Sequence, residues 1–452
     1  MRHPLAQRLV GELKEALDAG EERELERVLY RFSSVDVAIA MRQLGDAERE
    51  AVFAALEVAD AAALLEEVDD ETQAELQQTV DEKALTEIIE AMPPDERADA
   101  VALLDDRQAD RVLELMADEK SEELAKLLQH HPDSAGGVMT PEFVAVPEGV
   151  TAGEALKVLQ AGVVNPETLL YVYAVDEDDR LVGVVDLREL VTADPAAPLR
   201  SFYVTPVVRV APEVDQEHVA QLCKTYDLLA LPVVDEDGQL LGTVTIDDVM
   251  EIIDDEATED ISMMAGTDAR ELMRKSSLRV AQIRLPWILV CLLGSLFSGF
   301  IIKSFEVTLK EAIVLVVFIP IIIATGGNSG LQSATITVRG LALGIVQSWG
   351  VKTLLLREVF TAVIIGVVCG ATLGALAGLW AQQTVIGWIV GLSLCAAIMM
   401  ATTLGAVIPV VLDRFGIDPA VASGPFITTA NDALGLMIYF TIASSLLTVA
   451  AQ

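Results

Sequence analysis

Gly424-Pro425-Phe426-Ile427-Thr428-Thr429-Ala430-Asn431-Asp432 is the stretch that decides the architecture of the second half of this 452-residue chain. It lies inside the last long apolar segment, residues 420–450, and places a carboxylate inside a candidate membrane span. On a helix starting at residue 420, Asp432 would lie about 18 Å along the axis, near the middle of a bilayer. Inserting an ionisable group there costs at least about 2.5 kcal/mol, and such groups usually line the path of an ion or substrate. A structural aspartate bonded by neighbouring hydroxyl groups is the alternative. We expect no other acid of the apolar half to lie as deep.

Long apolar segments predict five membrane spans, at residues 285–302, 312–337, 354–379, 386–412 and 420–449. Basic residues cluster on one side of this arrangement, at Arg279, Arg284, Arg339, Lys352 and Arg414. The positive-inside rule then puts the N-terminal region in the cytoplasm and the C-terminus outside. The sequence therefore predicts a multi-pass protein of the cell (inner) membrane.

Glycine and polar residues interrupt the second span at residues 324–335. We expect Gly326 and Gly327 to break the helix and to free backbone carbonyl groups, which water, protein or an ion must satisfy. Asn328 and Gln332 lie at an i, i+4 spacing, which puts both side chains on one helix face. We favour a pore lining here over close helix packing through glycine, although both can hold together.

Charge is distributed unevenly along the chain. Acids and bases balance from Leu285 onward, six of each, so the part of the chain before Leu285 carries the whole net charge of −38. So negative a region disfavours nucleic acid and anionic lipid surfaces as partners and favours cations. An acidic, solvated surface is the simpler alternative. The four cysteines show no paired spacing, and the chain has no His-Glu-x-x-His motif, so neither a disulfide framework nor the usual zinc protease site is predicted.

The N-terminal part of the chain, up to about His131, is rich in leucine, alanine and glutamate and predicts helices throughout. Apolar pairs recur at equal intervals, at Ala40-Met41, Leu64-Leu65, Ile88-Ile89 and Val112-Leu113, and an acidic turn follows each pair. One such unit cannot bury its own apolar face. We therefore expect the units to stack into a small helical superhelix.

Two copies of a helix, strand, turn, strand, helix pattern follow, up to about residue 255. Their strands are expected at residues 170–175 and 181–186, and at 230–234 and 240–245. Each strand pair has an apolar-periodic helix before it and another after it. The pattern predicts a tandem of small α/β modules.

This tandem resembles a pair of CBS modules, whose signature ends match residues 181–190 and 241–249. Such pairs commonly bind adenine nucleotides, so ATP is a candidate ligand, although Leu228 offers no aromatic ring for a purine to stack on. The candidate nucleotide contacts are Arg188, Glu189 and Asp227.

Acidic residues crowd the end of the second module, at residues 247–260, and basic residues follow at 270–284. This reversal of charge leads directly into the first span. We expect a helix that joins the N-terminal region to the membrane; a solvated linker is the alternative.

The chain as a whole resembles the MgtE magnesium transporters and channels. The glycine-asparagine and proline-to-aspartate membrane motifs are the most specific part of the resemblance, which covers nearly the whole chain. The matching stretches are 134–140, 165–168, 256–261, 325–335 and 425–435. Residues 201–204 depart from the usual opening of the second CBS module.

The resemblance implies a multidomain membrane protein and a homodimer with its pore on the twofold axis. We expect an all-α superhelical N-terminal domain at residues 1–131 and α/β tandem CBS domains at 132–199 and 200–257. A connecting helix at 258–284 would plug the cytoplasmic mouth of a five-helix transmembrane domain at 285–452. The expected partners are a second copy of the chain, membrane lipid and divalent cations, without nucleic acid.

Carried over to this chain, the resemblance makes Asp432 the selectivity carboxylate of a Mg2+ uptake channel. Two copies of Asp432 in a dimer are expected to hold a largely hydrated Mg2+ through its water. Backbone carbonyl groups near Pro425 and the side chains of Asn328 and Thr428 would complete the ring.

Mg2+ is also the predicted closing signal. Carboxylates a few ångströms apart repel by about 1 to 4 kcal/mol per pair, so cytoplasmic Mg2+ that bridges them would draw the domains and the plug together. Asp418, on the loop before the last span, would join the plug contacts. The predicted bridging acids are Asp95, Glu217, Asp227, Asp247, Asp248, Glu251, Asp254, Asp255, Glu256, Glu259 and Asp260.

Two other classes of function stay open at this point. A CBS-controlled membrane protein that senses nucleotide or ionic strength would bind ligands without conducting divalent cations. A membrane enzyme would need a Ser-His, Cys-His or metal-ligand constellation, and the predicted spans contain none.

Overall fold

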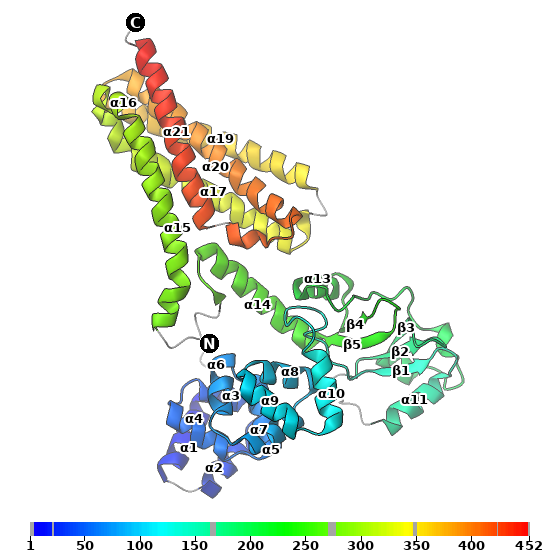
Figure 1. Cartoon of the computed structure of the whole chain (residues 1–452). Helices are drawn as coiled ribbons and strands as arrows, with labels where there is room; N and C mark the ends of the chain where they lie inside the picture. The colour runs from blue at the N-terminus through cyan, green and yellow to red at the C-terminus, as the bar shows by residue number, and fades with distance from the viewer. Residues whose placement is uncertain are drawn as a thin grey trace. The chain divides into compact units, whose positions relative to one another are not determined.

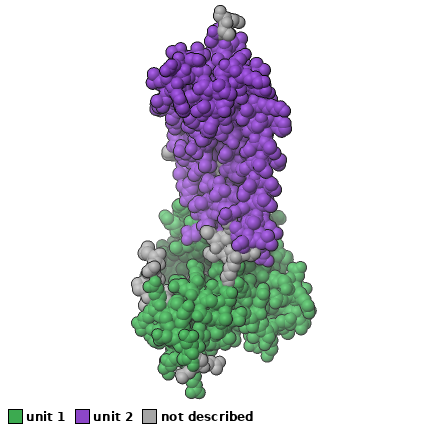
Figure 2. Space-filling model, turned by 90° about the vertical axis from the view of Figure 1, so that its left-hand side faces the viewer, with its two compact units in different colours: residues 1–253 green, residues 254–452 purple. Residues whose placement is uncertain are grey.

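The computed structural model describes residues 4–19, 22–162, 169–269, 277–346, 350–422 and 424–450 (Figure 1). The chain divides into two compact units, Met1–Ile253 and Asp254–Gln452 (Figure 2). The Asn165–Thr168 motif lies outside the described residues, as do Arg270, Arg274 and Lys275 of the predicted connecting helix.

Helical pairs build the first part of unit 1, after α1 (Pro4–Ala19) and α2 (Glu22–Leu29). The first helices of the pairs begin at equal intervals along the chain, and so do the second helices, so the predicted repeat is confirmed. The pairs are α3 (Ser34–Met41) with α4 (Asp46–Ala54), α5 (Val58–Glu67) with α6 (Asp70–Gln77), α7 (Glu82–Ala91) with α8 (Pro94–Ala102), and α9 (Asp106–Leu115) with α10 (Asp118–Leu127).

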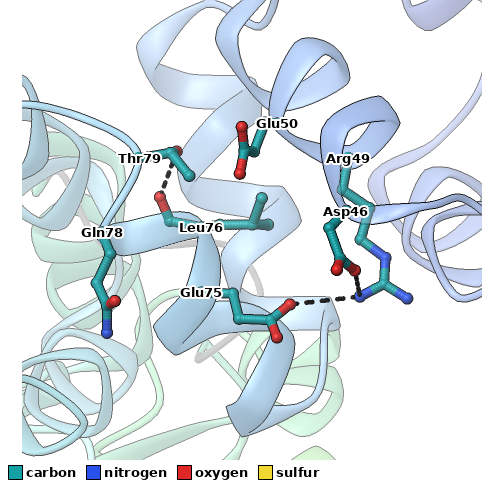
Figure 3. A pocket seen from close by; sticks show the side chains of 7 residues that line it. All are labelled: Asp46, Arg49, Glu50, Glu75, Leu76, Gln78 and Thr79. Carbon is teal, nitrogen blue, oxygen red and sulfur yellow. Dashed lines mark hydrogen bonds and ion pairs between the residues drawn. The ribbon is translucent and has the colours of Figure 1, made fainter. Parts of the chain in front are cut away.

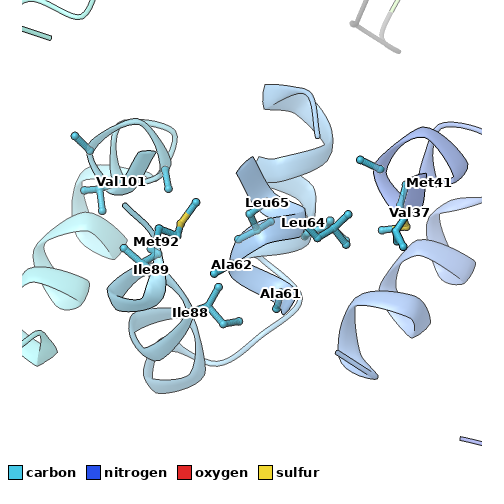
Figure 4. Packing of buried hydrophobic residues seen from close by; sticks show 14 of the residues in the cluster. Val37, Met41, Ala61, Ala62, Leu64, Leu65, Ile88, Ile89, Met92 and Val101 are labelled. Atoms are coloured by element: carbon cyan, nitrogen blue, oxygen red, sulfur yellow. The ribbon is translucent and has the colours of Figure 1, made fainter. Parts of the chain in front are cut away.

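The repeated apolar pairs form the core of this helical stack. Met41, Leu65 and Ile89 are fully buried, and Figure 4 shows them on successive layers with Leu64 and Ile88 beside them. Each helix pair therefore buries its apolar face against the next pair.

A second contact recurs in this stack and fastens the two helices of a pair together. Arg49 Nε donates to the Met41 carbonyl oxygen at 2.9 Å, and Arg97 Nε donates to the Ile89 carbonyl oxygen at 3.3 Å. Each bond adds a side-chain donor to a carbonyl group at the end of the first helix, which also accepts from the backbone N–H of Leu44 or of Met92.

Two α/β modules complete unit 1. In the first, β1 (Val144–Pro147) pairs in parallel with β2 (Tyr171–Val175), and β2 pairs antiparallel with β3 (Leu181–Asp186). In the second, β4 (Ala230–Val234) pairs antiparallel with β5 (Leu240–Thr245), so both predicted hairpins are confirmed. The accompanying helices are α11 (Ala152–Ala161), α12 (Leu187–Thr192) and α13 (Gln216–Tyr226), with a short 3-10 turn at η1 (Leu199–Ser201).

A buried hydrogen bond of 2.9 Å between the Tyr173 hydroxyl and Thr243 Oγ1 joins the two modules. The helix α14 (Ile246–Ala265) then leaves β5 and runs from unit 1 into unit 2. It is continuous across residue 258, where the connecting helix was predicted to begin.

Among the described residues, unit 2 contains five helices that are long and apolar enough to cross a membrane, as predicted. They are α15 (Ser277–Ser304), η3 (Ile313–Phe318) with α17 (Ile319–Ala342), α19 (Val351–Ala381), α20 (Thr384–Arg414) and α21 (Pro425–Ala450). The short segments α16 (Glu306–Glu311) and η4 (Pro419–Ala422) lie between them. The central helix α20 packs against α17, α19 and α21 (Figure 1).

Glycine lets α19 and α20 approach very closely. A Cβ atom added at Gly370 would lie 2.5 Å from the Gly391 carbonyl oxygen, and one added at Gly374 would lie 2.7 Å from the Gly387 carbonyl oxygen. No side chain fits at these positions, so the two backbones meet along a glycine seam.

The prediction that glycine breaks the second span is wrong. The helix α17 continues through Gly326, Gly327 and Gly330, and the backbone departs from α-helix earlier, in η3. The glycines serve packing, because a Cβ atom added at Gly405 of α20 would lie 2.2 Å from the Gly330 carbonyl oxygen. Tyr439 of α21 donates to the Leu315 carbonyl oxygen at 2.8 Å, which satisfies one carbonyl group of the irregular segment.

Candidate ion path and acidic site

Asp432 is the eighth residue of α21, which begins at Pro425 rather than at residue 420. It therefore lies about 10 Å from the start of the helix, not the predicted 18 Å, because the residues before Gly424 form the separate turn η4. Proline suits the first position of a helix, where its missing N–H group is not needed. Asp432 is half-buried, and its Oδ1 atom is buried with no hydrogen-bond partner among the described residues.

The predicted pore residues of α17 lie on two different faces. Asn328 and Gln332 are exposed in the single chain, on the face expected from their spacing. Gly326 is buried against α21, where the side chain of Asn431 occupies the space beside it. Thr428 of α21 is exposed, and its hydroxyl donates to the Gly424 carbonyl oxygen at 3.0 Å, which leaves its oxygen free to accept.

Glu358 overturns the expectation that Asp432 is the only deeply placed acid. It is the eighth residue of α19 and is 5% exposed. Its carboxylate accepts a 2.9 Å hydrogen bond from the Ser333 hydroxyl of α17 and lies 3.5 Å from the Arg357 guanidinium. A hydropathy average over the span does not reveal a single buried acid. The spacing of Glu358 from Gly366 and Gly370 of the glycine seam would have placed it on the packed face of the helix.

The end of α14 packs against the start of α21, both within unit 2. A Cβ atom added at Gly424 would lie 2.2 Å from the Met264 carbonyl oxygen, and one added at Gly266 would lie 3.2 Å from the Pro425 ring. This contact touches the helix that carries Asp432, two turns before it.

Asp260 of α14 lies near the loop that precedes α21. Burial raises its pKa, the Asp418 carboxylate raises it further, and Arg339 lowers it. The predicted bridging acid Asp260 and the predicted plug contact Asp418 are thus within electrostatic reach of each other and form the first acidic site.

A second acidic site joins α8 of the helical stack to the start of α14, both within unit 1. Burial, followed by the charges of Asp95 and Asp99, raises the pKa of Glu96 to about 9. Burial also raises the pKa of Asp248 to about 7, with Asp95 and Asp247 adding to the effect.

Asp95 lies at the centre of this acidic site. Burial raises its pKa, with Glu142 and Asp247 contributing, and its Oδ1 atom is buried without a hydrogen-bond partner among the described residues. Asp99 belongs to the same site: burial of its carboxylate and the Asp95 charge raise its pKa, although the residue as a whole reaches the exposed edge. The sequence predicted Asp95, Asp247, Asp248 and Glu251 here but missed Glu96, Asp99 and Glu142.

The other predicted acids lie on α13 and along the middle of α14. Glu217 follows the N-cap of α13 and accepts from Gln221 at 3.4 Å, and Asp227 ends α13 in a left-handed conformation. The acids along the middle of α14 are exposed or half-buried, namely Asp254, Asp255, Glu256 and Glu259.

The candidate nucleotide contacts lie on exposed positions of the α/β modules. Arg188 of α12 bonds the Asp186 carboxylate through Nε at 3.0 Å and through Nη2 at 2.5 Å. Glu189 beside it is exposed. A phosphate group would have to compete with Asp186 for the arginine.

A hollow of about 440 Å³ lies between α4 and α6, apart from every predicted site residue (Figure 3). Figure 3 shows the carboxylates of Asp46 and Glu75 facing the same nitrogen of Arg49, Nη1, which lies 3.9 Å from Asp46 and 3.5 Å from Glu75. The same arginine also donates to the Met41 carbonyl oxygen. The residues around this hollow therefore hold the helix pairs together.

Within the described residues, no three His, Cys, Asp or Glu side chains gather closely enough to hold a bare metal ion. The two acidic sites and Asp432 instead offer separated carboxylates, several of them half-buried. Such sites suit a cation that keeps part of its water shell, as Mg2+ does.

Family comparisons match the chain part by part. The family described as MgtE, divalent cation transporter, matches residues 319–442. The MgtE intracellular N domain matches residues 32–133, and the CBS domain matches residues 135–196 and 199–255.

Two solved structures resemble unit 1 and confirm the superhelical and CBS parts of the fold. The cytosolic domain of the Mg2+ channel MgtE in complex with ATP has a TM-score of 0.52 at 39% identity and covers 54% of this chain and 99% of that chain. The soluble part of a magnesium transporter has a TM-score of 0.51 at 30% identity and covers 56% of this chain and 99% of that chain.

Curated relatives cover the membrane half as well. The magnesium transporter MgtE of Enterococcus faecalis is 40% identical over 326 residues, 72% of each chain. The magnesium transporter MgtE of Thermus thermophilus is 35% identical over 448 residues, 98% of this chain and 99% of that protein. The predicted family is therefore confirmed, and the chain belongs to the MgtE family of divalent cation transporters.

Proposed function

We propose that this protein carries Mg2+ into the cell and that cytoplasmic Mg2+ closes it. The family is one of membrane transporters rather than enzymes, and its relatives from three bacteria are named magnesium transporters. Within this chain, one observation carries the proposal. Asp432 lies two turns inside a membrane helix with a buried carboxylate oxygen that no described residue satisfies.

Mg2+ binds oxygen ligands in octahedral geometry and gives up its water reluctantly. A carboxylate with an unused oxygen can accept hydrogen bonds from the water shell of such an ion. Asn328 and the Thr428 oxygen would add further acceptors, together with carbonyl groups near Pro425. The ion would thus cross this region largely hydrated.

A homodimer with the path on its twofold axis is the assembly that we propose. Asn328 and Gln332 are exposed on one face of α17 in the single chain. Polar side chains on a lipid-facing surface are costly, whereas a second copy facing them would enclose a polar path. The basic residues that flank the spans favour a cytoplasmic N-terminal region and an outside C-terminus.

Closure would depend on α14. This helix carries acids of the site beside α8 and also Asp260, which lies near Asp418. Asp247, Asp248 and Glu251 lie near its start, and Met264, which touches Gly424, lies near its end. Without a cation, the crowded carboxylates favour separation of α14 from α8. Bound Mg2+ would neutralise them and hold α14 in the position that covers the path.

ATP is a second ligand that we propose for the α/β modules. The related cytosolic domain at 39% identity was solved in complex with ATP. Arg188, Glu189 and Asp227 are the candidate contacts. Calorimetric titration of ATP into the full-length protein should show binding that Arg188→Ala weakens, and an unaltered isotherm would remove Arg188 from the site.

Growth of a strain that lacks Mg2+ uptake tests the transport proposal. Expression of this protein should restore growth at low Mg2+, and Asp432→Ala should abolish the rescue at equal protein level. Asp413→Ala, which removes an exposed carboxylate near the end of α20, is the matched control and should retain the rescue. Full rescue by Asp432→Ala would contradict the proposed role.

A further inference from the structure

Asn431 is the residue before Asp432, and it is 1% exposed. Its Nδ2 atom donates to the Ile323 carbonyl oxygen of α17 at 3.1 Å. A carbonyl oxygen has two lone pairs, so Ile323 can accept this bond without giving up its place in the helix. The amide of Asn431 therefore ties α21 to α17 beside the candidate ion path.

Gly326 provides the space that this tie requires. A Cβ atom added at Gly326 would lie 2.8 Å from Asn431 Oδ1, closer than real Cβ contacts come. Any other residue at position 326 would push the Asn431 side chain off the Ile323 carbonyl group. The structure thus gives Gly326 a role in seating Asn431, where the sequence suggested only a pore lining.

The Oδ1 atom of Asn431 is buried with no hydrogen-bond partner among the described residues. A buried acceptor without a partner is destabilising, and an apolar side chain of the same size would avoid that cost. Tight packing alone therefore does not account for asparagine at this position. Asparagine adds polar contacts instead: its directional bond to Ile323 fixes the rotation and the height of α21 against α17. Its side chain also makes a hydrogen bond with the Asp432 carboxylate beside it.

We propose that Asn431 is a positioning residue that sets the place of the Asp432 carboxylate and thereby the preference for Mg2+ over larger divalent cations. This inference rests on the proposed function. Neighbouring residues on a helix turn and shift together, so α21 held at Asn431 is also held at Asp432. Ca2+ accepts longer and less regular ligand distances than Mg2+ does, so a loosely held carboxylate discriminates less between the two ions.

Flux of Mg2+ and of Ca2+ into liposomes that contain the full-length protein tests this role. Asn431→Ala should lower the ratio of Mg2+ to Ca2+ flux about fivefold, the effect of losing one directional hydrogen bond, while Mg2+ flux continues. An unchanged ratio would overturn the proposal, whether or not both fluxes fall, because an equal fall is what a merely structural role gives.

Gly326→Ala provides an independent arm, because it displaces Asn431 without removing it. It should lower the flux ratio to the same extent. The double variant Gly326→Ala with Asn431→Ala should show no further fall and should be at least as stable as Asn431→Ala, since the new methyl group fills the vacated space. Additive effects on the ratio would contradict the shared mechanism. The double variant also keeps the test available if Asn431→Ala alone folds poorly.

Gly435→Ala is the matched control, one turn further along the same helix, where an added Cβ meets nothing within 4 Å. It should keep the wild-type flux ratio. Asp432→Ala, measured in parallel, separates the two proposals. Persistent Mg2+ flux in Asp432→Ala would remove the proposed ion path, whereas lost flux there with an unchanged ratio in Asn431→Ala would remove only the positioning role.

Discussion

Asp432 and Glu358 are each the eighth residue of a membrane helix, and the protein surrounds them in opposite ways. Glu358 is 5% exposed and has a hydroxyl donor in Ser333 and a charge partner in Arg357. Asp432 is half-buried, and one of its oxygens has no partner among the described residues. The order of the helices puts both acids the same distance from the side of the bundle where α19 and α21 begin.

Under the proposed function, the difference separates a carboxylate that serves packing from one that would bind a hydrated cation. A buried acid whose oxygens all have donors gains little from an ion, whereas an acid with one buried oxygen left without a donor gains more. The acidic site around Asp95 belongs with Asp432 in this respect, because Asp95 Oδ1 is also buried without a partner among the described residues. Cations should therefore stabilise that site and should leave the surroundings of Glu358 unaffected.

Loss of Glu358 gives the largest expected effect on stability. Glu358→Ala leaves a cavity and a buried Ser333 hydroxyl without its acceptor, and it should lower the free energy of unfolding by about 3 kcal/mol. Glu358→Gln keeps an acceptor oxygen and should cost about 1 kcal/mol. Unfolding in detergent, with and without Mg2+, measures both. If Mg2+ restored the lost stability, Glu358 would be a cation site like Asp432, and the contrast between the two acids would be wrong.

Gly405→Ala tests the packed side of the bundle without touching a charge. The added Cβ would lie 2.2 Å from the Gly330 carbonyl oxygen, and backbone cannot yield as a side chain does. The variant should be about 2 kcal/mol less stable. Gly299→Ala on α15, where an added Cβ meets nothing within 4 Å, is the control and should be neutral. Equal stability of the two variants would mean that α17 and α20 pack less closely than described.

Asp95→Asn should weaken the response of the protein to Mg2+. Removing the charge at the centre of the acidic site should raise the Mg2+ concentration that half-protects the protein from protease about tenfold, which corresponds to about 1.4 kcal/mol. Glu119→Gln is the matched control, because Glu119 holds the same position in the next helix pair and is exposed. A control that responds as strongly as Asp95→Asn would make the effect one of general surface charge.

The smallest expected effect is a dependence of Mg2+ protection on pH. The folded-state pKa of Glu96 is raised to about 9 and that of Asp248 to about 7. Acids with raised pKa values stabilise the folded state most at low pH, and that contribution is lost as pH rises through about 7 to 9. At pH 6 protons thus neutralise part of the carboxylate charge that Mg2+ neutralises at pH 8. Mg2+ should raise the melting temperature more at pH 8 than at pH 6; the reverse order would contradict the assignment.

Much of the fold follows from period and turn chemistry. The repeat of helix pairs and both hairpins were predictable because their apolar spacing is strict and their turns are acidic and short. The depth of Asp432 in an apolar segment and the crowding of acids likewise pointed to Asp432, Asp95 and Asp248 as site residues. These predictions needed only local pattern and the order of the motifs along the chain.

The predictions that were wrong or missing concern residues whose role depends on which helix face packs against another helix. Glycine at Gly326 and Gly330 can break a helix or let two helices touch, and composition does not distinguish the two outcomes. Glu358 was missed because hydropathy averages over a span and ignores its partners. Asn431 stood in the quoted motif, yet its bond to Ile323 joins residues 108 positions apart, which no local pattern reveals.

Mg2+ flux through liposomes that contain Asp432→Asn or Glu358→Gln tests the central claim most directly, since each change removes one charge and little volume. Asp432→Asn should fold normally and lose Mg2+ flux by at least about tenfold. Glu358→Gln should keep flux within about twofold of wild type while losing stability. Wild-type flux in Asp432→Asn, or abolished flux in a well-folded Glu358→Gln, would contradict the account.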